Sequence, residues 1–225
     1  AVYDGQEHRV TAEVNQDDLV GDDKAQVISY ENNTAVSPGT YTAKAVALDN
    51  VNYTIGTQNS TQEWTIEGMS ISDAVITLDN SPLVYNGKEQ TREVVSVTLT
   101  GTDGKEILLV KGTDYTIVND TNVNAGNYIL KVMGKGNYTG SVSAEYTIEK
   151  AVEPEKIPTA EETKIQLPSD INSMDKVALP DGWVWENPKA EPVPGGMVEV
   201  KAVRQDAGNY EKNFEVIYQI SREPE

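Results

Sequence analysis

The sequence predicts an all-β protein that is built from small β-sandwiches in tandem. Short runs in which apolar and polar residues alternate recur along the whole chain, as in strands that cover a core with one face. Clusters of Gly, Asn and Pro separate these runs and are typical of reversals between strands. No stretch of useful length has the apolar spacing of an amphipathic helix, and the best helical candidate, residues 171–176, spans barely one turn.

The clearest strand pair lies within residues 124–148. Apolar side chains alternate over residues 128–132, and a second alternating run follows over residues 142–148. Gly and Asn at residues 134–137 interrupt the pattern between the two runs. Because strict alternation places apolar side chains on one face of a strand, this segment predicts a β-hairpin that covers a core on one side.

The same plan occurs more than once, which is the strongest feature of the sequence. Both complete copies contain a Tyr-Asp/Asn-Gly turn, a Gly-containing turn before a tyrosine, an Asn-Tyr pair and a closing aromatic-Thr-Ile strand. These landmarks lie at 3–5, 37–41, 52–53 and 64–66 in the first copy, and at 85–87, 124–128, 137–138 and 146–148 in the second. Asp-Gly and Asn-Gly favour tight turns because both residues tolerate a positive φ.

A third segment keeps only the second half of this plan. It has Gly-Asn-Tyr at residues 208–210 and a closing alternating strand over residues 214–220. Its first half carries Leu-Pro-Asp-Gly-Trp-Val-Trp at residues 179–185 in place of the Tyr-Asp-Gly turn. We therefore expect a divergent relative of the other two repeats.

The closing strands set the predicted domain boundaries. We expect a first β-sandwich repeat over residues 1–68, a second over residues 69–151 and the divergent third over residues 152–225. The stretch 149–158 holds two prolines and several charges, which predicts a stiff, extended linker. Short strands with frequent turns favour a sandwich in each repeat.

Taken together, the ordered landmarks resemble the bacterial immunoglobulin-like repeats of the MBG or YDG type. The resemblance covers nearly the full length, and the third segment is similar to divergent repeats that occur beside such domains. It implies tandem immunoglobulin-like β-sandwich domains in a large, multidomain bacterial surface protein. It also implies an extracellular or wall-attached location and no catalysis. The family has no common binding-site signature, so the resemblance assigns no ligand residues.

The amino-acid composition disfavours or excludes several classes of partner and site. The chain has 225 residues and a net charge of −18, from 36 acidic and 18 basic side chains. This balance disfavours nucleic acid and anionic membrane as partners, because phosphate contacts need Lys or Arg. No run approaches the roughly 20 apolar residues that span a bilayer. The absence of cysteine excludes disulfides, thiolate zinc sites and cysteine nucleophiles.

Candidate catalytic groups are few, and we expect no enzyme activity and no cofactor. His8 is the only histidine, and a solvated strand histidine is the favoured interpretation over a member of a Ser-His-Asp triad. One histidine without cysteine also disfavours zinc. Carboxylate pairs arise by chance among 36 acidic residues, so they do not by themselves predict a glycosidase.

Two other clusters are candidates for binding. Asp17, Asp18, Asp22 and Asp23 form the densest acidic stretch and could supply calcium ligands, although the EF-hand spacing is absent and a solvated loop is favoured. Trp183 and Trp185 fall on one face of a strand and match no slot in the other repeats, so one of them could be exposed and bind a ligand. The favoured interpretation for both is core.

These observations predict a non-catalytic spacer, or stalk, from a bacterial cell-surface or secreted protein. We expect a monomer whose partners are the neighbouring domains of the same polypeptide, with no metal ion and no membrane insertion. The alternative is an adhesive module that binds a glycan or a host surface protein. Exposed aromatic rings near Trp183 and Trp185 would favour that alternative.

Overall fold

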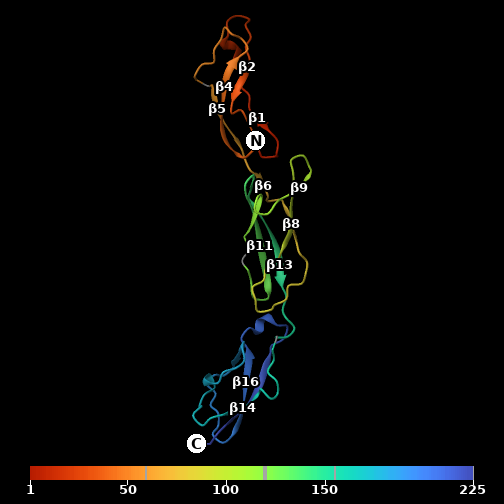
Figure 1. Ribbon diagram of the computed structural model, residues 1–225, viewed down its shortest axis with the longest axis vertical. Helices are drawn as coiled ribbons and strands as arrows, with labels where there is room; N and C mark the ends of the chain where they lie inside the picture. Colours follow the sequence, from red (N-terminus) through yellow and green to blue (C-terminus); the bar gives the residue numbers. More distant parts are fainter. Residues whose placement is uncertain (59, 119–120, 155, 225) are drawn as a thin grey trace. The chain divides into compact units, whose positions relative to one another are not determined.

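The computed structural model describes residues 1–58, 60–118, 121–154 and 156–224, and it is all-β, as the sequence predicts (Figure 1). Among the described residues, 44% lie in strands or bridges and no α-helix occurs. The helical candidate at residues 171–176 contains a short 3-10 helix, Met174–Lys176. Within the described residues, no helix is long and apolar enough to cross a membrane.

Short strands follow one another along the whole chain. In chain order they are β1 (His8–Arg9), β2 (Val27–Glu31), β3 (Thr34–Ala35), β4 (Gly39–Leu48), β5 (Thr61–Ile66), β6 (Met69–Ser70), β7 (Val75–Leu78), β8 (Val94–Thr100), β9 (Glu106–Leu108), β10 (Tyr115–Val118), β11 (Gly126–Gly134), β12 (Tyr138–Thr139), β13 (Ser141–Ile148), β14 (Lys164–Leu167), β15 (Trp183–Trp185), β16 (Met197–Arg204) and β17 (Glu215–Arg222). The described 3-10 helices are η1 (Gln16–Asp18), η2 (Met174–Lys176) and η3 (Ala207–Asn209).

The contacts divide the chain into two compact units. Unit 1 contains Ala1–Asp79, Glu93–Asn119 and Ile129–Ala144, and unit 2 contains Asn80–Arg92, Asp120–Tyr128 and Glu145–Glu225. The predicted domain boundaries, which follow the sequence repeats, differ from this division by contacts. The division into three repeats therefore stays a prediction.

In the first repeat, which belongs to unit 1, β2, β4 and β5 form an antiparallel sheet. Tyr41 lies opposite Trp64 in the β4–β5 register, and their ring centroids are 5.1 Å apart. Trp64, Ile66 and Ala43 form a small buried cluster. The indole Nε1 of Trp64 donates a hydrogen bond of 3.1 Å to the carbonyl oxygen of Asn32. Trp64 is thus a core residue, as its place in the repeat predicts.

The second repeat contributes further sheets to unit 1. Strands β7, β8 and β9 form an antiparallel sheet, and β10 pairs with β11 so that Tyr115 lies opposite Gly134. Val97, Leu130 and Val132 are each 0% exposed. The alternation over residues 128–132 thus faces a core, as predicted.

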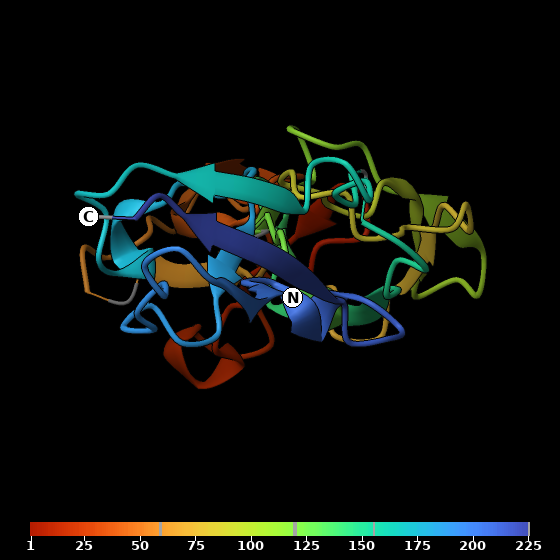
Figure 2. The ribbon, with the colours of Figure 1, turned by 90° about the horizontal axis from the view of Figure 1, so that it is seen from below.

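Unit 2 contains a sheet in the order β14-β17-β16-β15, drawn in cyan to blue in Figures 1 and 2. Strand β14 is parallel to β17, whereas the β17–β16 and β16–β15 pairs are antiparallel. Its inward side chains form one cluster, because successive residues of a strand point to opposite faces. The buried members of this cluster are Leu167, Met174, Trp183, Trp185, Val200, Ala202, Tyr218 and Ile220.

The Tyr-Asp-Gly and Tyr-Asn-Gly segments form the tight turns that their residue types predict. Gly5 and Gly87 have φ values of 80° and 73°, which is a region that glycine enters without steric cost. The side chains of Asp4 and Asn86 each accept a hydrogen bond of 2.9 Å from the backbone amide two residues further on. This Asx geometry fixes the turn from within the local sequence.

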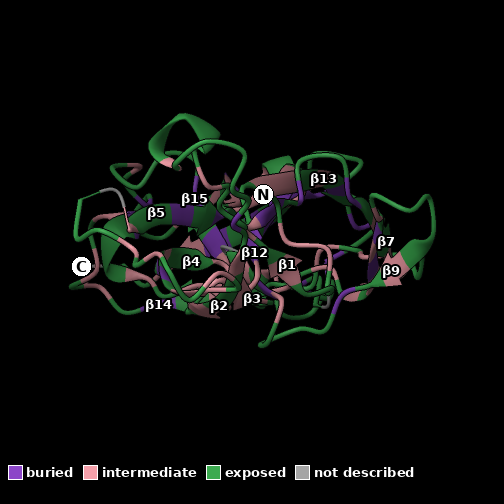
Figure 3. Ribbon diagram, turned by 90° about the horizontal axis from the view of Figure 1, so that it is seen from above, coloured by how far each residue is buried: buried purple, intermediate pink, exposed green. Residues whose placement is uncertain are grey.

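Burial follows the strands in both units. Figure 3 colours buried residues purple and exposed residues green, and most loop residues are green. On β5, β11 and β15, buried and exposed residues alternate. This is the pattern of strands with one face against a core and one face toward solvent.

Candidate functional site

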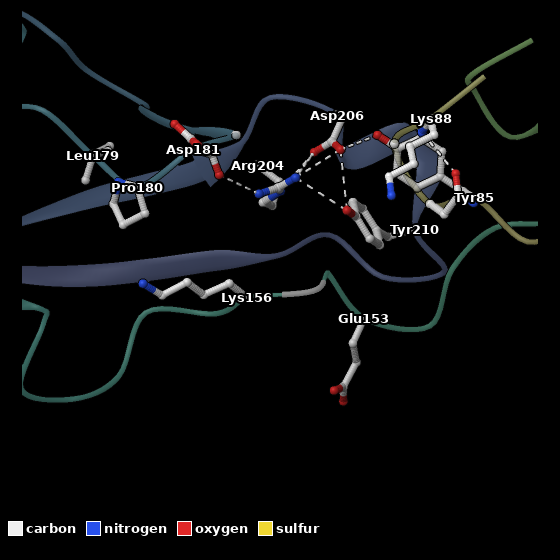
Figure 4. A pocket seen from close by; sticks show the side chains of 13 residues that line it. Tyr85, Lys88, Glu153, Lys156, Leu179, Pro180, Asp181, Arg204, Asp206 and Tyr210 are labelled. Carbon is white, nitrogen blue, oxygen red and sulfur yellow. Dashed lines mark hydrogen bonds and ion pairs between the residues drawn. The ribbon is translucent and has the colours of Figure 1, made fainter.

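A large pocket in unit 2 is a candidate site (Figure 4). It has a volume of about 1210 Å³. Its lining comes from residues 85–88 and 179–182, and from Glu153, Lys156, Arg204, Asp206 and Tyr210. The Tyr-Asn-Gly turn of the second repeat and the divergent first half of the third segment thus line one cavity.

Arg204, at the end of β16, is the centre of the polar lining. Its guanidinium makes a two-point contact with Asp206, with Nε to Oδ1 at 2.8 Å and Nη2 to Oδ2 at 3.0 Å. Nη1 donates to the carbonyl oxygen of Asp181 at 3.0 Å. The guanidinium also lies 5.7 Å from the ring centroid of Trp183 and 5.6 Å from that of Tyr210, within the range of cation–π attraction.

Tyr85 joins this ion pair through its hydroxyl. The hydroxyl donates a hydrogen bond of 2.5 Å to Oδ2 of Asp206. Burial, together with the adjacent Asp206 carboxylate, raises the pKa of Tyr85 to about 12. Burial alone would raise the pKa of Asp206, but the hydrogen bond from Tyr85 and the charge of Arg204 outweigh it and lower that pKa. The cluster therefore holds a neutral phenol against an ionised carboxylate.

Other charged side chains, among them Lys88, Glu153 and Lys156, also line the pocket. Lys156 forms an ion pair with Glu162 at 3.4 Å, and Figure 4 shows Glu153 pointing away from Arg204. Each nitrogen of Arg204 already donates to Asp206 or to the Asp181 carbonyl. A guanidinium in this state offers little to an anionic ligand. The cluster links three separate stretches of unit 2, through Tyr85, Asp181 and the Arg204–Asp206 pair.

Both candidate tryptophans belong to the core of unit 2. Trp183 is 5% exposed and Trp185 is 8% exposed. The indole Nε1 of Trp185 donates to the carbonyl of Val177 at 2.8 Å, and its ring packs edge-on against Tyr218 at 5.0 Å. A buried ring has no free face on which a sugar could stack. This is the core placement that the sequence favours for both residues.

The acidic candidates for calcium lie in and after η1. Asp17, Asp18 and Asp22 are exposed, and Oδ2 of Asp23 accepts a hydrogen bond of 2.8 Å from the Tyr53 hydroxyl. Within the described ranges, no group of three or more acidic or histidine side chains is placed to hold a metal ion. The structure thus does not bring these four carboxylates together as one ligand set.

His8, on β1, lies beside an acidic partner. Its Nε2 is 3.1 Å from Oδ1 of Asp4, and the His8 side chain is 22% exposed. Asp4 belongs to the Tyr-Asp-Gly turn and also accepts from the amide of Gln6. The pair lies at the start of the first repeat, and no serine hydroxyl is among the contacts recorded for His8 within the described residues.

A second feature, which we call the tyrosine junction, occurs once in each unit. In unit 1, Tyr3 of the first repeat packs edge-on against Tyr138 of the second, with centroids 5.8 Å apart and planes at 82°. In unit 2, Tyr85 of the second repeat packs against Tyr210 of the third segment in the same way, at 5.5 Å and 85°. Each junction joins the tyrosine of a Tyr-x-Gly turn to that of the next Asn-Tyr landmark.

The backbone around the unit 1 junction continues from one repeat to the next. Val2 forms a parallel bridge with Glu67, which aligns the start of the first repeat with the end of its closing strand. The chain then runs to Met69, whose amide donates a hydrogen bond of 3.0 Å to the carbonyl of Asn137. Strand pairing therefore passes from the first repeat into the second without a free segment between them.

The unit 2 junction has the same backbone plan. Val84 forms a parallel bridge with Glu149, and the amide of Ala151 donates to the carbonyl of Asn209 at 3.0 Å. These positions match those in unit 1 one for one along the repeat. The tyrosine contact and the backbone bonds thus recur as a set.

The unit 2 junction also has buried polar contacts. Asn209 is 7% exposed, its Nδ2 donates to Oδ1 of Asn124 at 3.0 Å, and its Oδ1 accepts from the amide of Ala125 at 2.7 Å. Both the nitrogen and the oxygen of this buried side-chain amide thus have partners within the protein, which avoids the cost of an unpaired buried group. Together with Arg204 and Asp206, Asn209 makes this junction the more polar of the two.

The sequence marks Tyr3, Tyr85, Tyr138 and Tyr210 as landmarks of the repeats but does not indicate that they contact one another. The available signal was the fixed order of the two tyrosine motifs in successive repeats. The role of Arg204 had no recognisable signal, because Asp206 lies only two residues away but Asp181 and Trp183 lie more than 20 residues earlier in the chain.

We compared the chain with family models, curated proteins and solved structures, and none of the three comparisons found a match.

Proposed function

We propose that the chain is a non-catalytic spacer of tandem immunoglobulin-like β-sandwich repeats, from a bacterial cell-surface or secreted multidomain protein. Its repeats are of the MBG or YDG type on the strength of the sequence landmarks. The segment holds its neighbouring domains apart and works extracellularly as a monomer. The tyrosine junction is the single observation that carries this proposal.

The junction supports a spacer because it limits motion where repeats meet. Edge-on aromatic pairs add roughly 0.5–1.5 kcal/mol beyond the area that they bury. Backbone bonds such as Met69 N to Asn137 O leave no free linker at the same place. An enzyme or a recruitment module has no need of the same connector twice, whereas a spacer needs it at each repeat.

Small-angle scattering of the full chain tests this function. A spacer predicts a pair-distance distribution with a long tail, and a compact particle of this mass would contradict the proposal. Tyr3→Ala and Tyr85→Ala should each broaden the distribution, because each removes one ring of a junction. Tyr41→Ala is the matched control, since Tyr41 pairs with Trp64 within the first repeat and should leave the long distances unchanged.

The unit 2 pocket is the observation that favours an adhesive module for a glycan or a host protein. Lys88 and Lys156 line it beside the Arg204 cluster. Glycan arrays and host-matrix binding assays with the full chain test this second function. Binding that is lost in Lys88→Ala and kept in Lys24→Ala, which lies in unit 1, would support it. A lack of binding on all surfaces would favour the spacer alone.

A further inference from the structure

We propose that Asn86 is a modification site, at which the side chain loses ammonia and becomes a carboxylate that pairs with Lys88. The reaction is intramolecular, and water is its only other reactant. This inference goes beyond both proposed functions and depends on neither, because it concerns one turn of unit 2. The turn lines the pocket of Figure 4 with residues 85–88.

The sequence distinguishes Asn86 from the other asparagines. It is the only asparagine in the chain that is followed directly by glycine. Loss of ammonia requires the next backbone nitrogen to reach the side-chain carbonyl carbon, and a Cβ atom on that next residue hinders the approach. Gly87 has no Cβ atom, and glycine enters backbone regions that other residues avoid. The local sequence therefore provides the least hindered nitrogen at this position.

The structure leaves the reacting groups of this turn accessible. Asn86 and Gly87 are exposed, and a Cβ atom added at Gly87 would have only the Tyr85 hydroxyl nearby, at 3.9 Å. Within the described part of the chain, neither the Gly87 amide nor the Asn86 side-chain nitrogen donates a hydrogen bond. Oδ1 of Asn86 accepts a hydrogen bond of 2.9 Å from the amide of Lys88. This bond polarises the side-chain carbonyl and so favours attack on its carbon.

The reaction balances without an oxidant or a reductant. The backbone nitrogen of Gly87 attacks Cγ of Asn86, so that a carbon–nitrogen bond forms and the bond between Cγ and Nδ2 breaks. Ammonia leaves with the proton of the Gly87 amide, and a cyclic imide remains. Water then opens the ring at Cγ, which gives aspartate, or at the main-chain carbonyl, which gives isoaspartate. Either product adds one negative charge to the turn.

The first repeat shows that an aspartate fits at this place in the turn. There Asp4 precedes Gly5, whose φ of 80° is close to the 73° of Gly87. Oδ1 of Asp4 accepts a hydrogen bond of 2.9 Å from the amide two residues further on, as Oδ1 of Asn86 does at the same length. The aspartate form of residue 86 therefore keeps the geometry of the turn.

The turn at residues 103–105 shows what the new carboxylate would contact. It has the Asp-Gly-Lys sequence that residues 86–88 acquire in the reaction, and Gly104 has a φ of 79°. Oδ1 of Asp103 accepts a hydrogen bond of 3.0 Å from the amide of Lys105, and Oδ2 lies 3.0 Å from Nζ of the same lysine. The side-chain and backbone hydrogen bonds from Lys105 lower the pKa of Asp103. We expect the same pair between residue 86 and Lys88.

This pair changes the charge that the pocket presents to a ligand. Lys88, Lys156 and Arg204 are its cationic lining residues, and the last two already have acidic partners at 3.4 Å and 2.8 Å. No ion pair among the described residues includes Lys88. Conversion of Asn86 gives Lys88 a partner as well, so this part of the pocket changes from cationic to neutral. The modification thus weakens the binding of an anionic group, and it does so irreversibly.

Peptide mass spectrometry of the full chain, sampled during incubation at mildly alkaline pH, tests the modification. We expect residue 86 to gain the mass difference between an amide and an acid, and ion-exchange chromatography to show one more negative charge. Asn172, which is exposed and precedes Ser173, is the internal reference and should stay intact over the same period. Asn86→Gln should abolish the charge shift. An Asn86 that stays intact, or that converts no faster than Asn172, would overturn the proposal.

The new ion pair is tested with a carbodiimide, which joins a carboxylate to an amine in contact with it as an amide. Asp103 and Lys105 are the internal positive control, because they form an ion pair in the unmodified chain. We expect a cross-link between residue 86 and Lys88 in the incubated chain and in Asn86→Asp, and none in the fresh chain. A cross-link at 103–105 without one at 86–88 in Asn86→Asp would overturn the pairing with Lys88. Both readouts are local, so they are independent of the scattering and glycan-array results.

Discussion

At the scale of single residues, the protein places its most specific chemistry at the unit 2 junction. Asp206 holds Arg204 at two points and accepts from Tyr85. Hydrogen bonds to charged groups contribute about 1.5–3 kcal/mol, more than neutral ones. Most ion pairs elsewhere join exposed side chains, as Lys105 and Asp103 do, and such pairs contribute roughly 0–1 kcal/mol.

Tyr85→Phe removes one hydroxyl from this cluster and keeps the ring. We expect the free energy of unfolding to fall by about 1–2 kcal/mol, because Asp206 loses a charge-assisted hydrogen bond in a partly buried place. Chemical denaturation monitored by tryptophan fluorescence measures this change, since Trp183 and Trp185 lie in the same unit. The control is Tyr3→Phe, at the matching position of unit 1. An equal loss in both variants would contradict the role of Asp206.

The same hydroxyl predicts a dependence of stability on alkaline pH. Above pH 10 the unfolded chain loses the proton of Tyr85, whereas the folded chain keeps it until about pH 12. The stabilisation is thus complete below pH 10 and falls as the pH rises toward 12. Denaturation midpoints measured between pH 9 and pH 12 should fall more steeply for the wild type than for Tyr85→Phe. Parallel profiles would show that Tyr85 does not have the raised pKa.

At the scale of elements, alternation predicted the strands well, because side-chain direction within a strand is a local property. The hairpin within residues 124–148 illustrates this, since Leu130, Val132 and Ile148 are fully buried. The partners of the strands were not predictable in the same way. The parallel pairs β6–β12 and β14–β17 join segments far apart in sequence, and no local pattern encodes such a choice.

The candidate site was predictable only in part, for the same reason. The Tyr-x-Gly turns carry their own Asx hydrogen bonds, so sequence alone identified them. The Arg204 cluster depends on Asp181, Asp206 and Tyr85, which come from three separate stretches. The burial of Trp183 and Trp185 was the favoured interpretation, but their places in the sheet became clear only with its register.

Close packing, and not backbone φ, requires a glycine at position 134, the last residue of β11. A Cβ atom at this position would lie 2.8 Å from the backbone nitrogen of Thr139 and 2.8 Å from the carbonyl carbon of Tyr138. Since backbone atoms of β12 cannot move aside as a side chain can, Gly134→Ala should destabilise the protein by about 1–3 kcal/mol. Thermal unfolding followed by circular dichroism measures the change.

Gly56→Ala is the matched control for that variant. A Cβ atom at Gly56 would meet nothing within 4 Å, so the substitution should be neutral or slightly stabilising, because alanine restricts the unfolded chain. Equal stability of Gly134→Ala and Gly56→Ala would show that β12 does not approach β11 closely at Gly134.

At the scale of the whole molecule, charge is the dominant property. The chain carries 36 acidic and 18 basic side chains, a net charge of −18. A net charge this far from zero favours solubility and repels nucleic acid, but it also destabilises a folded chain through self-repulsion. The exposed ion pairs do not offset this repulsion, because each contributes so little.

Salt should therefore stabilise this protein. The Debye length falls from about 30 Å at 0.01 M salt to about 8 Å at 0.15 M, so added NaCl screens repulsion between distant carboxylates more than attraction within close pairs. We expect the unfolding midpoint to rise by a few degrees over that range, and Asp18→Asn with Asp22→Asn, both exposed, to reduce the rise. Calcium and magnesium chlorides at equal ionic strength then separate screening from binding, because a calcium site at Asp17, Asp18, Asp22 and Asp23 would raise the midpoint with calcium alone. A midpoint that falls as NaCl is added would mean that the ion pairs outweigh the repulsion, and the argument from net charge would be wrong.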